Sequence, residues 1–260
     1  MVNTTKLSRW TFNIFVEKIL KKKWKIFYSK DIEKIISHIM WETYTRTKWY
    51  KLVHQANMKW YLIILKKDLY YIPHSWEEID DIIQKRYWTI LHNHIKDYIQ
   101  WKWLITWITA LQLLLQNYEI PDMISILSPN KQCQEVIIRD KITAIKKMNS
   151  WWQSLFPILK NTAKKIMVNK KSFYITSVTI SLLETFYANT DSNATTNELG
   201  KKILRKYRKQ LDRDEVTMLL RKGKYHTSIN KLYYLARAID DTYANHIMDI
   251  IKKHSYRISI

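Results

Sequence analysis

The stretch YLIILKKDLYYIP, residues 61–73, decides how the amino-terminal part of the chain is interpreted. Its two short runs of Ile, Leu and Tyr are separated by Lys66, Lys67 and Asp68, and Pro73 ends the second run. Runs of this composition around a polar turn are typical of a β-hairpin, and proline cannot continue a hydrogen-bonded strand. The sequence therefore predicts a hairpin over these residues.

Three amphipathic helices precede this hairpin. Apolar residues recur three and four positions apart over residues 12–20 and again over residues 32–39. We expect Ser29 to cap the second helix, because a serine oxygen can accept a hydrogen bond from a free N–H of the first turn. A third helix is predicted over residues 46–58. Three helices followed by a hairpin describe a winged helix, which we assign to residues 1–73.

The third helix is the candidate DNA-reading element. One of its faces is apolar and the other is basic and hydrogen-bonding. In a winged helix such a face enters the major groove, where Gln can bind adenine and Arg or Lys can bind guanine or phosphate, while wing lysines bind flanking phosphates. A solvated helix face in a small packing domain is the alternative, and spacing does not separate the two. The candidate DNA-binding residues are Arg46, Lys48, Lys51, His54 and Gln55 on the helix and Lys66 and Lys67 on the hairpin.

The net charge of +21 is concentrated in two parts of the chain. Residues 1–73 carry 15 Lys and Arg against 5 Asp and Glu, residues 74–159 carry 9 of each, and residues 160–260 carry 20 against 9. Two basic lobes thus flank a neutral middle. Nucleic acid is the commonest intracellular polyanion, so this distribution favours nucleic-acid contact.

Residues 74–174 are predicted to form a small α+β unit. Ser75, followed by several acidic residues, indicates the capped start of a helix, and paired catalytic carboxylates are the alternative. The apolar run at residues 104–115 predicts a helix. The runs EIPDMISILSP, CQEVII and KITAIKK then predict a small antiparallel sheet.

Residues 175–260 are predicted to form a basic helical bundle, with Asp212 and Ser228 as helix caps. The runs KKILRKYRK and RKGKYH would suit a nucleic-acid backbone or an acidic partner, and a merely solvated face fits them equally well. The fold class expected for the whole chain is α+β, mainly helical. The five helical patterns cover residues 178–187, 198–208, 215–221, 229–239 and 243–253.

Several classes of protein and site are not expected. The longest apolar run is shorter than the roughly 20 residues that span a bilayer, and the first ten residues lack the apolar core of a secretory signal, so we expect a cytoplasmic protein without membrane contact. Cys133 is the single cysteine, and His92 and His94 would point to different faces of a helix. Because the sequence also lacks a Gly-rich phosphate loop and a nucleophile elbow, we expect no enzyme, no metal and no cofactor.

Twelve tryptophans against two glycines is an unusual composition. Every tryptophan lies within residues 10–152, which hold no glycine. Trp24, Trp60 and the pair Trp151 and Trp152 are expected at turn positions, where glycine readily adopts a left-handed backbone. We therefore hypothesise that UGA codons meaning glycine have been rendered as tryptophan. The alternative is an AT-rich genome that disfavours glycine codons and encodes genuine tryptophans.

The predicted winged helix with YLIILKKDLYYIP, the ITAL-containing helix and the IPD segment with its small sheet together resemble AbiEi-type antitoxins of type IV toxin–antitoxin systems. The resemblance covers residues 20–150 best. It implies that the amino-terminal domain binds double-stranded DNA at the protein's own promoter and represses its operon, and that the following domain antagonises a nucleotidyltransferase-like toxin. Asp68 stands where the family's wing often has glycine. The alternatives are an operon-specific transcription regulator without a toxin and a nucleic-acid-processing enzyme.

Overall fold

The computed structural model describes residues 8–21, 26–41, 44–66, 68–73, 77–99, 102–129, 135–138, 141–147, 150–188, 194–211, 213–221 and 225–253. The chain divides into two compact units. The first comprises Met1–Asn93 with Ile137–Lys141, and the second comprises His94–Val136 with Ile142–Ile260. The three-part division predicted from the sequence, with boundaries after residues 73 and 174, stays a prediction.

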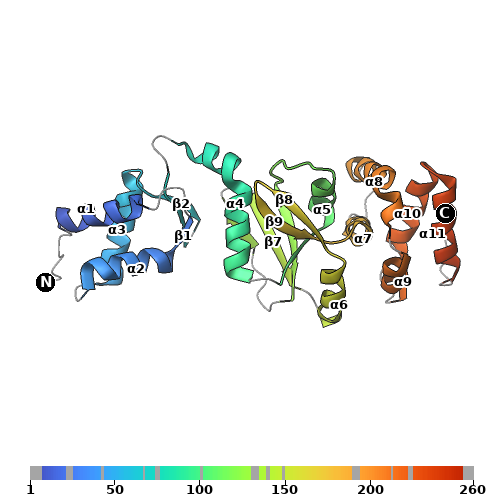
Figure 1. Cartoon of the computed structure of the whole chain (residues 1–260), viewed down its shortest axis with the longest axis horizontal. Coiled ribbons are helices and arrows are strands. Elements are labelled where there is room, and N and C mark those ends of the chain that lie inside the picture. Colours follow the sequence, from blue (N-terminus) through green and yellow to red (C-terminus); the bar gives the residue numbers. More distant parts are fainter. Residues whose placement is uncertain are drawn as a thin grey trace. The chain divides into compact units, whose positions relative to one another are not determined.

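The first unit begins with a winged helix. The element order is α1 (Arg9–Leu20), β1 (Ile26–Tyr28), α2 (Ser29–Met40), α3 (Arg46–Met58), β2 (Ile63–Lys66) and β3 (Leu69–Tyr71), as Figure 1 shows. The hairpin β2–β3 and the three helices are therefore confirmed. The short strand β1 was not predicted; it pairs antiparallel with β3, which gives the strand order β1–β3–β2.

The core of this winged helix consists of the apolar faces that the sequence predicted. Leu52, Val53 and Ala56 of α3 are buried against α1 and α2, and each such Leu or Val side chain contributes about 1.5–3 kcal/mol relative to an exposed one. The other buried residues of this core include Phe12, Phe15 and Ile19 of α1 and Ile32 and Ile36 of α2.

The start of α2 corrects the cap predicted at Ser29. Ser29 is the first helical residue, and Tyr28 occupies the cap position with its backbone N–H donating to Asp31 Oδ2 at 3.1 Å. The Ser29 hydroxyl is directed away from its own helix and donates to Asp68 Oδ1 at 2.6 Å. The prediction was wrong because a partner 39 residues away binds the hydroxyl, which local sequence cannot show.

The end of α3 is relevant to the tryptophan hypothesis. Trp60 has φ 60, its N–H donates to the carbonyl of Asn57 at 3.0 Å, and the N–H of Tyr61 donates to the carbonyl of Ala56 at 3.0 Å. This is the Schellman arrangement, in which the residue at the position of Trp60 is usually glycine. Trp41 and Trp107 also have positive φ values, 33 and 61. The backbone at these three tryptophans is thus of the kind that favours glycine.

Other tryptophans lie in ordinary helix or core positions. Trp49, Trp88 and Trp103 are buried, and each packs against an aromatic neighbour. Trp151 and Trp152 lie in α6 (Ser150–Asn161), so the prediction that they occupy a turn is wrong; the helix begins one residue before them. Trp24 lies outside the described residues.

The larger sheet belongs mainly to the second unit and is mixed. Its strands follow the order β6–β7–β5–β4–β9–β8, with β4 (Leu104–Thr106), β5 (Met123–Ser128), β6 (Glu135–Ile138), β7 (Lys141–Lys147), β8 (Lys164–Val168) and β9 (Lys171–Ile175). β5 pairs parallel with β7, and β4 pairs parallel with β9. The antiparallel sheet predicted from the sequence is therefore wrong. β6 lies at the sheet edge rather than between β5 and β7, so these two strands meet in the same direction.

The apolar run at residues 104–115 is not one helix. It begins as the buried strand β4 and continues as α5 (Trp107–Leu114), with the change of direction at Trp107. A short apolar run fits a buried strand and a buried helix equally well, because both of its sides are covered. The single helix predicted here is corrected accordingly.

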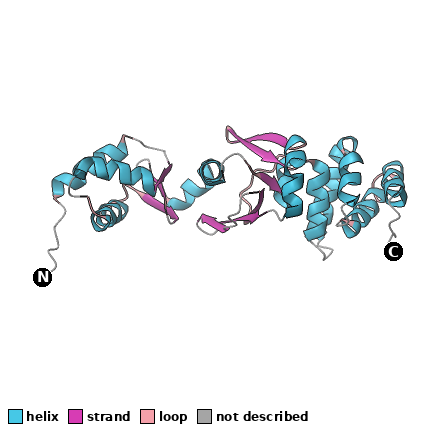
Figure 2. Ribbon diagram, turned by 90° about the horizontal axis from the view of Figure 1, so that it is seen from below, coloured by secondary structure: helices cyan, strands magenta, loops and turns pink. Residues whose placement is uncertain are grey.

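In the described part of the chain, five α-helices follow the sheet, as predicted for the carboxy-terminal region. They are α7 (Val178–Ala188), α8 (Ala194–Tyr207), α9 (Arg213–Arg221), α10 (His226–Arg237) and α11 (Asp241–Lys253), and Figure 2 shows them in cyan beside the magenta strands. The cap predicted at Ser228 is wrong, because Ser228 is buried inside α10. Ser75, Asp212 and Cys133 lie outside the described residues. Within the part of the chain that the structure describes, no helix is long and apolar enough to cross a membrane.

Candidate nucleic-acid interface

The helix α3 begins and ends at the predicted residues, for local reasons. Thr45 precedes it in an extended conformation, and its hydroxyl accepts a hydrogen bond from the N–H of Lys48 at 3.2 Å, which caps the first turn. The buried side of the helix is fixed by the core residues described above. Arg46–Met58 contains no Asp or Glu, so the whole outer side of the helix is free of negative side chains.

The outer face of α3 is centred on Thr47, Tyr50, Lys51, His54 and Met58. An α-helix turns by about 100° per residue, so these five residues lie opposite the buried side. All five are exposed. The polar atoms that this face presents are therefore hydroxyl, imidazole and ammonium groups, which include both donors and acceptors.

The five predicted helix residues differ in their position on α3 and in their exposure. Lys51 and His54 lie at the centre of the exposed face, and Arg46 and Gln55 lie exposed at its two flanks. Lys48 is half-buried beyond the Gln55 flank. Lys66 is the last residue of β2, and the structure describes its backbone alone. Lys67 lies outside the described residues.

Two central residues of this face were missed in the sequence analysis. Thr47 and Tyr50 are exposed there, and the Arg46 guanidinium lies 5.9 Å from the centroid of the Tyr50 ring. Tyr50 also meets Trp49 edge-on, with ring centroids 4.8 Å apart. The signal for both was present in the helical spacing, because Thr47 and Tyr50 precede His54 by seven and four positions.

The turn of the β2–β3 hairpin is short and attached to α2. Lys66 pairs with Leu69, and Asp68 has φ 66, a left-handed conformation that Asp tolerates better than most residues. Two hydrogen bonds hold this residue: the Ser29 hydroxyl donates to its carboxylate at 2.6 Å, and the Ser29 N–H donates to its carbonyl at 3.3 Å. The wing is therefore fixed to the first residue of α2.

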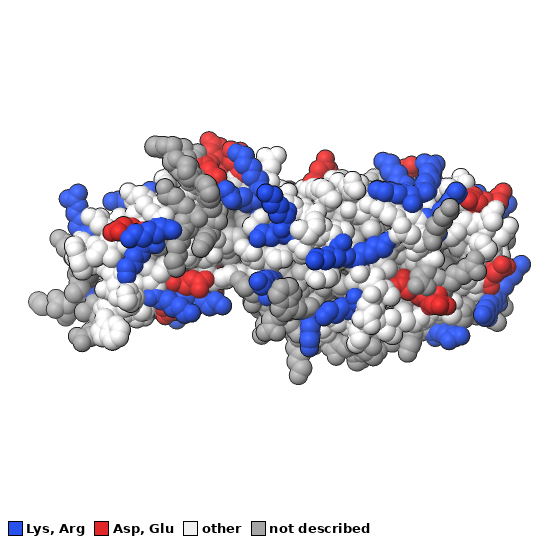
Figure 3. All heavy atoms as spheres, viewed as in Figure 1, with Lys and Arg blue, Asp and Glu red and all other residues white. Residues whose placement is uncertain are grey.

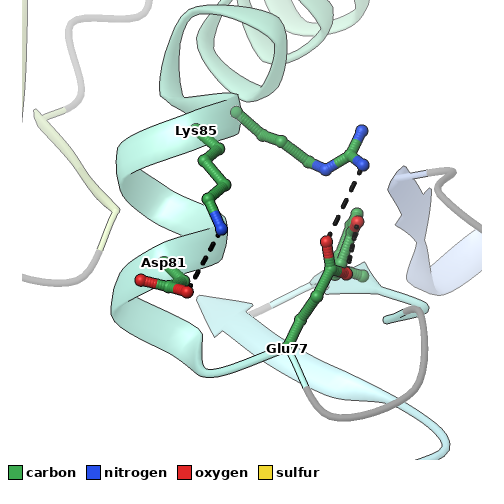
Figure 4. A network of polar contacts seen from close by, with 5 residues as sticks. Glu77, Asp81 and Lys85 are labelled. Carbon is green, nitrogen blue, oxygen red and sulfur yellow. Dashed lines mark hydrogen bonds and ion pairs between the residues drawn. The ribbon is translucent and has the colours of Figure 1, made fainter.

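A polar contact joins β3 to the start of α4 (Ile79–Ile99) within the first unit, as Figure 4 shows. The Tyr71 hydroxyl donates to Glu77 Oε2 at 3.2 Å, and the Arg86 guanidinium lies 3.8 Å from Glu77 Oε1. Burial raises the pKa of Tyr71 to about 12, so its hydroxyl keeps the proton that it donates. Asp80 and Asp81 occupy the first turn of α4, as predicted, and Asp81 pairs with Lys85 at 3.2 Å. Asp80 and Asp81 thus lie at the start of α4, and Glu77 contacts Tyr71 of the sheet.

The comparisons with known proteins bear on the fold. No protein-family model matches the chain, and no curated protein matches it. A similar solved structure is the crystal structure of the RV2827C protein from Mycobacterium tuberculosis, with a TM-score of 0.60 and 8% sequence identity. The match covers 98% of this chain and 84% of that chain. The likeness therefore shows that the two chains share a fold, which here is α+β and mainly helical, with a winged helix in the amino-terminal unit.

Proposed function

We propose that this protein binds double-stranded DNA through α3 and represses transcription from its own promoter as a DNA-binding antitoxin. The observation that carries the DNA-binding part is the outer face of α3, which is exposed, lacks Asp and Glu, and rests on a winged-helix core. In winged helices the third helix is the element that enters the major groove.

The composition of this face favours sequence reading over simple charge attraction. Gln55 can donate to and accept from adenine, and Lys51 can reach guanine or a phosphate. Thr47 and His54 add hydrogen-bonding groups of other kinds. The attachment of the wing turn to α2 through Ser29 and Asp68 supports the wing as a second, phosphate-binding contact.

Repression of the protein's own operon and antagonism of a nucleotidyltransferase-like toxin rest on the resemblance to AbiEi-type antitoxins. An operon-specific regulator without a toxin would use the same α3 face. Co-expression with a nucleotidyltransferase-like toxin from the same operon separates the two: rescue of growth supports the antitoxin, and lack of rescue by a well-expressed chain removes it.

The DNA-binding proposal is tested by titrating the full chain against the duplex upstream of its own gene and a scrambled duplex of equal length. Specific sites are typically bound about 10³–10⁷ times more tightly than non-specific DNA. The Gln55→Ala change should reduce this preference by about 1–3 kcal/mol, because it removes a base contact. The Lys51→Ala change should reduce the affinity of the chain for the upstream duplex at both low and high salt concentration. If Lys51 binds a phosphate, the change should also lower the salt slope, which is the slope of log affinity against log salt concentration, by about one.

Lys252→Ala is the matched control, because it removes one exposed lysine from α11 in the other unit. It should leave the preference for the upstream duplex unchanged. Equal affinity of the well-folded chain for both duplexes would exclude sequence-specific binding and with it the autorepressor.

A further inference from the structure

A second basic surface lies in the second unit, on the β8–β9 hairpin and α8. We define the hairpin–α8 surface by six cations that are exposed or half-exposed: Lys165, Lys170 and Lys171 of the hairpin and Lys202, Arg205 and Lys206 of α8. Among the described residues, none of the six forms an ion pair. Figure 3 shows Lys and Arg side chains gathered over this part of the molecule.

The hairpin presents its lysines on a tight turn. Val168 pairs with Lys171, and the two residues between them, Asn169 and Lys170, have φ values of 47 and 62. Two consecutive left-handed residues are typical of the two-residue turns that suit a twisted hairpin. Neither strand contains Asp or Glu, so the hairpin carries only positive charge.

Contacts around Tyr207 join the hairpin to α8. The Tyr207 hydroxyl donates to the carbonyl of Leu114 at 2.6 Å, which fixes the ring. The ammonium groups of Lys164 and Lys206 lie 5.2 and 5.3 Å from its centroid, and Lys164 also donates to the side chain of Gln210. These contacts place the open end of the hairpin beside the last turn of α8, so the two basic segments, far apart in sequence, are neighbours in this unit.

The chemistry of this surface indicates its partner. α8 contains one acidic residue, Glu198, which is already paired with Lys201 at 2.7 Å. Two aromatic rings beside these cations are engaged: Tyr207 as described, and Tyr174 half-buried against Trp103 with ring centroids 6.1 Å apart. Single-stranded nucleic acid needs open aromatic rings for base stacking, and protein interfaces are depleted of lysine at their centre. The phosphate backbone of a duplex requires only positive charge.

We propose that the hairpin–α8 surface binds the phosphate backbone of duplex DNA without reading its sequence, so that one chain contacts DNA through both units. The use of this second contact at the chain's own promoter rests on the proposed function. The contact itself does not rest on the proposed function, because a phosphate contact that reads no base can form with any duplex.

The test compares two triple variants of the full chain. K165Q/K170Q/K171Q removes three charges from the hairpin, and R237Q/K252Q/K253Q removes three exposed charges from α10 and α11 of the same unit. If each hairpin lysine contacts one phosphate, the first variant should lower the salt slope by roughly three. Between 50 and 200 mM salt, the unmodified chain should then lose about 40-fold more affinity than this variant. The second variant should keep the original slope.

The outcomes separate this inference from the proposed function. A hairpin variant with a lower slope on both upstream and scrambled duplexes, and an unchanged ratio between them, supports the inference. If the unmodified chain has no preference for its upstream duplex but the hairpin variant still lowers the slope, only the proposed function fails. An unchanged slope in a hairpin variant with an unchanged melting temperature overturns the inference, as does a slope change confined to single-stranded RNA.

Discussion

The two basic surfaces of this protein differ in the variety of their polar groups. The outer face of α3 combines Thr47, Lys51 and His54 with Gln55 at its flank, whereas the hairpin–α8 surface consists of Lys and Arg. Positive charge alone attracts any phosphate backbone, but discrimination between bases needs donors and acceptors in a defined arrangement. A positive net charge therefore favours contact with nucleic acid in general, and the mixture of side chains on a surface decides whether that surface is suited to reading bases.

The largest effect is expected from a change in the core beneath α3, because this change should affect the α3 face and not the hairpin–α8 surface. Leu52 is fully buried under α3, so Leu52→Ala should reduce the free energy of unfolding by about 2–5 kcal/mol and remove the preference for the upstream duplex. Leu232→Ala in α10 removes an equally buried leucine from the second unit. It should cost a similar free energy in denaturant unfolding while the preference remains. Retention of both stability and preference by the Leu52 variant would contradict the α3 assignment.

A smaller effect is expected where a helix of each unit ends. Trp60 after α3 and Gln116 after α5 have φ values of 60 and 64, and the N–H groups of Tyr61 and Asn117 close the same Schellman arrangement. Replacing either residue by glycine should raise the free energy of unfolding by about 1 kcal/mol, because glycine removes the left-handed strain.

Trp49→Gly is the control for the Trp60 variant. It removes a buried ring near the start of α3 and should lower the free energy of unfolding by about 3–5 kcal/mol. A loss of stability in Trp60→Gly would count against the hypothesis that glycine belongs at that position.

The smallest expected effect compares the two hairpin turns. Asp68→Asn keeps the left-handed residue and the acceptor for the Ser29 hydroxyl but removes a negative charge from the wing. It should tighten binding to both duplexes by about 0.2–1 kcal/mol, the range of exposed charge pairs. Asn169→Asp makes the opposite change beside Lys170 and should weaken binding by a similar amount. Opposite signs in the same titration would confirm that both turns lie near DNA, and an unchanged affinity at one turn would exclude that turn.

Local sequence was sufficient to predict the three helices of the winged helix. The third helix has its predicted bounds, and its predicted apolar side is buried, because a helical pattern on a half-buried element is strong. The strand β1 has only three residues, which is too few for a periodic pattern to be recognised. Its conformation comes from pairing with β3, more than 40 positions along the chain.

The candidate surfaces were predictable to different degrees. Four of the five predicted helix residues are exposed on α3, as the spacing indicated. The β8–β9 hairpin was not predicted, because lysines dilute the alternation of its strands and β9 is held by pairing with β4. The run KKILRKYRK was recognised as basic. Its contact with the hairpin is made by Tyr207 and Lys164, which meet only in the folded chain.

The position of β8 in the sheet has a consequence for solubility. In the described part of the chain β8 is the last strand of the order, so one side of its backbone is open to a further strand. An open edge of this kind is a template for aggregation, and lysine on the edge strand is a common protection. Lys164 and Lys165 bring like charges together when two copies approach edge to edge. The basic character of this strand is therefore expected to disfavour edge-to-edge pairing of two copies of the chain.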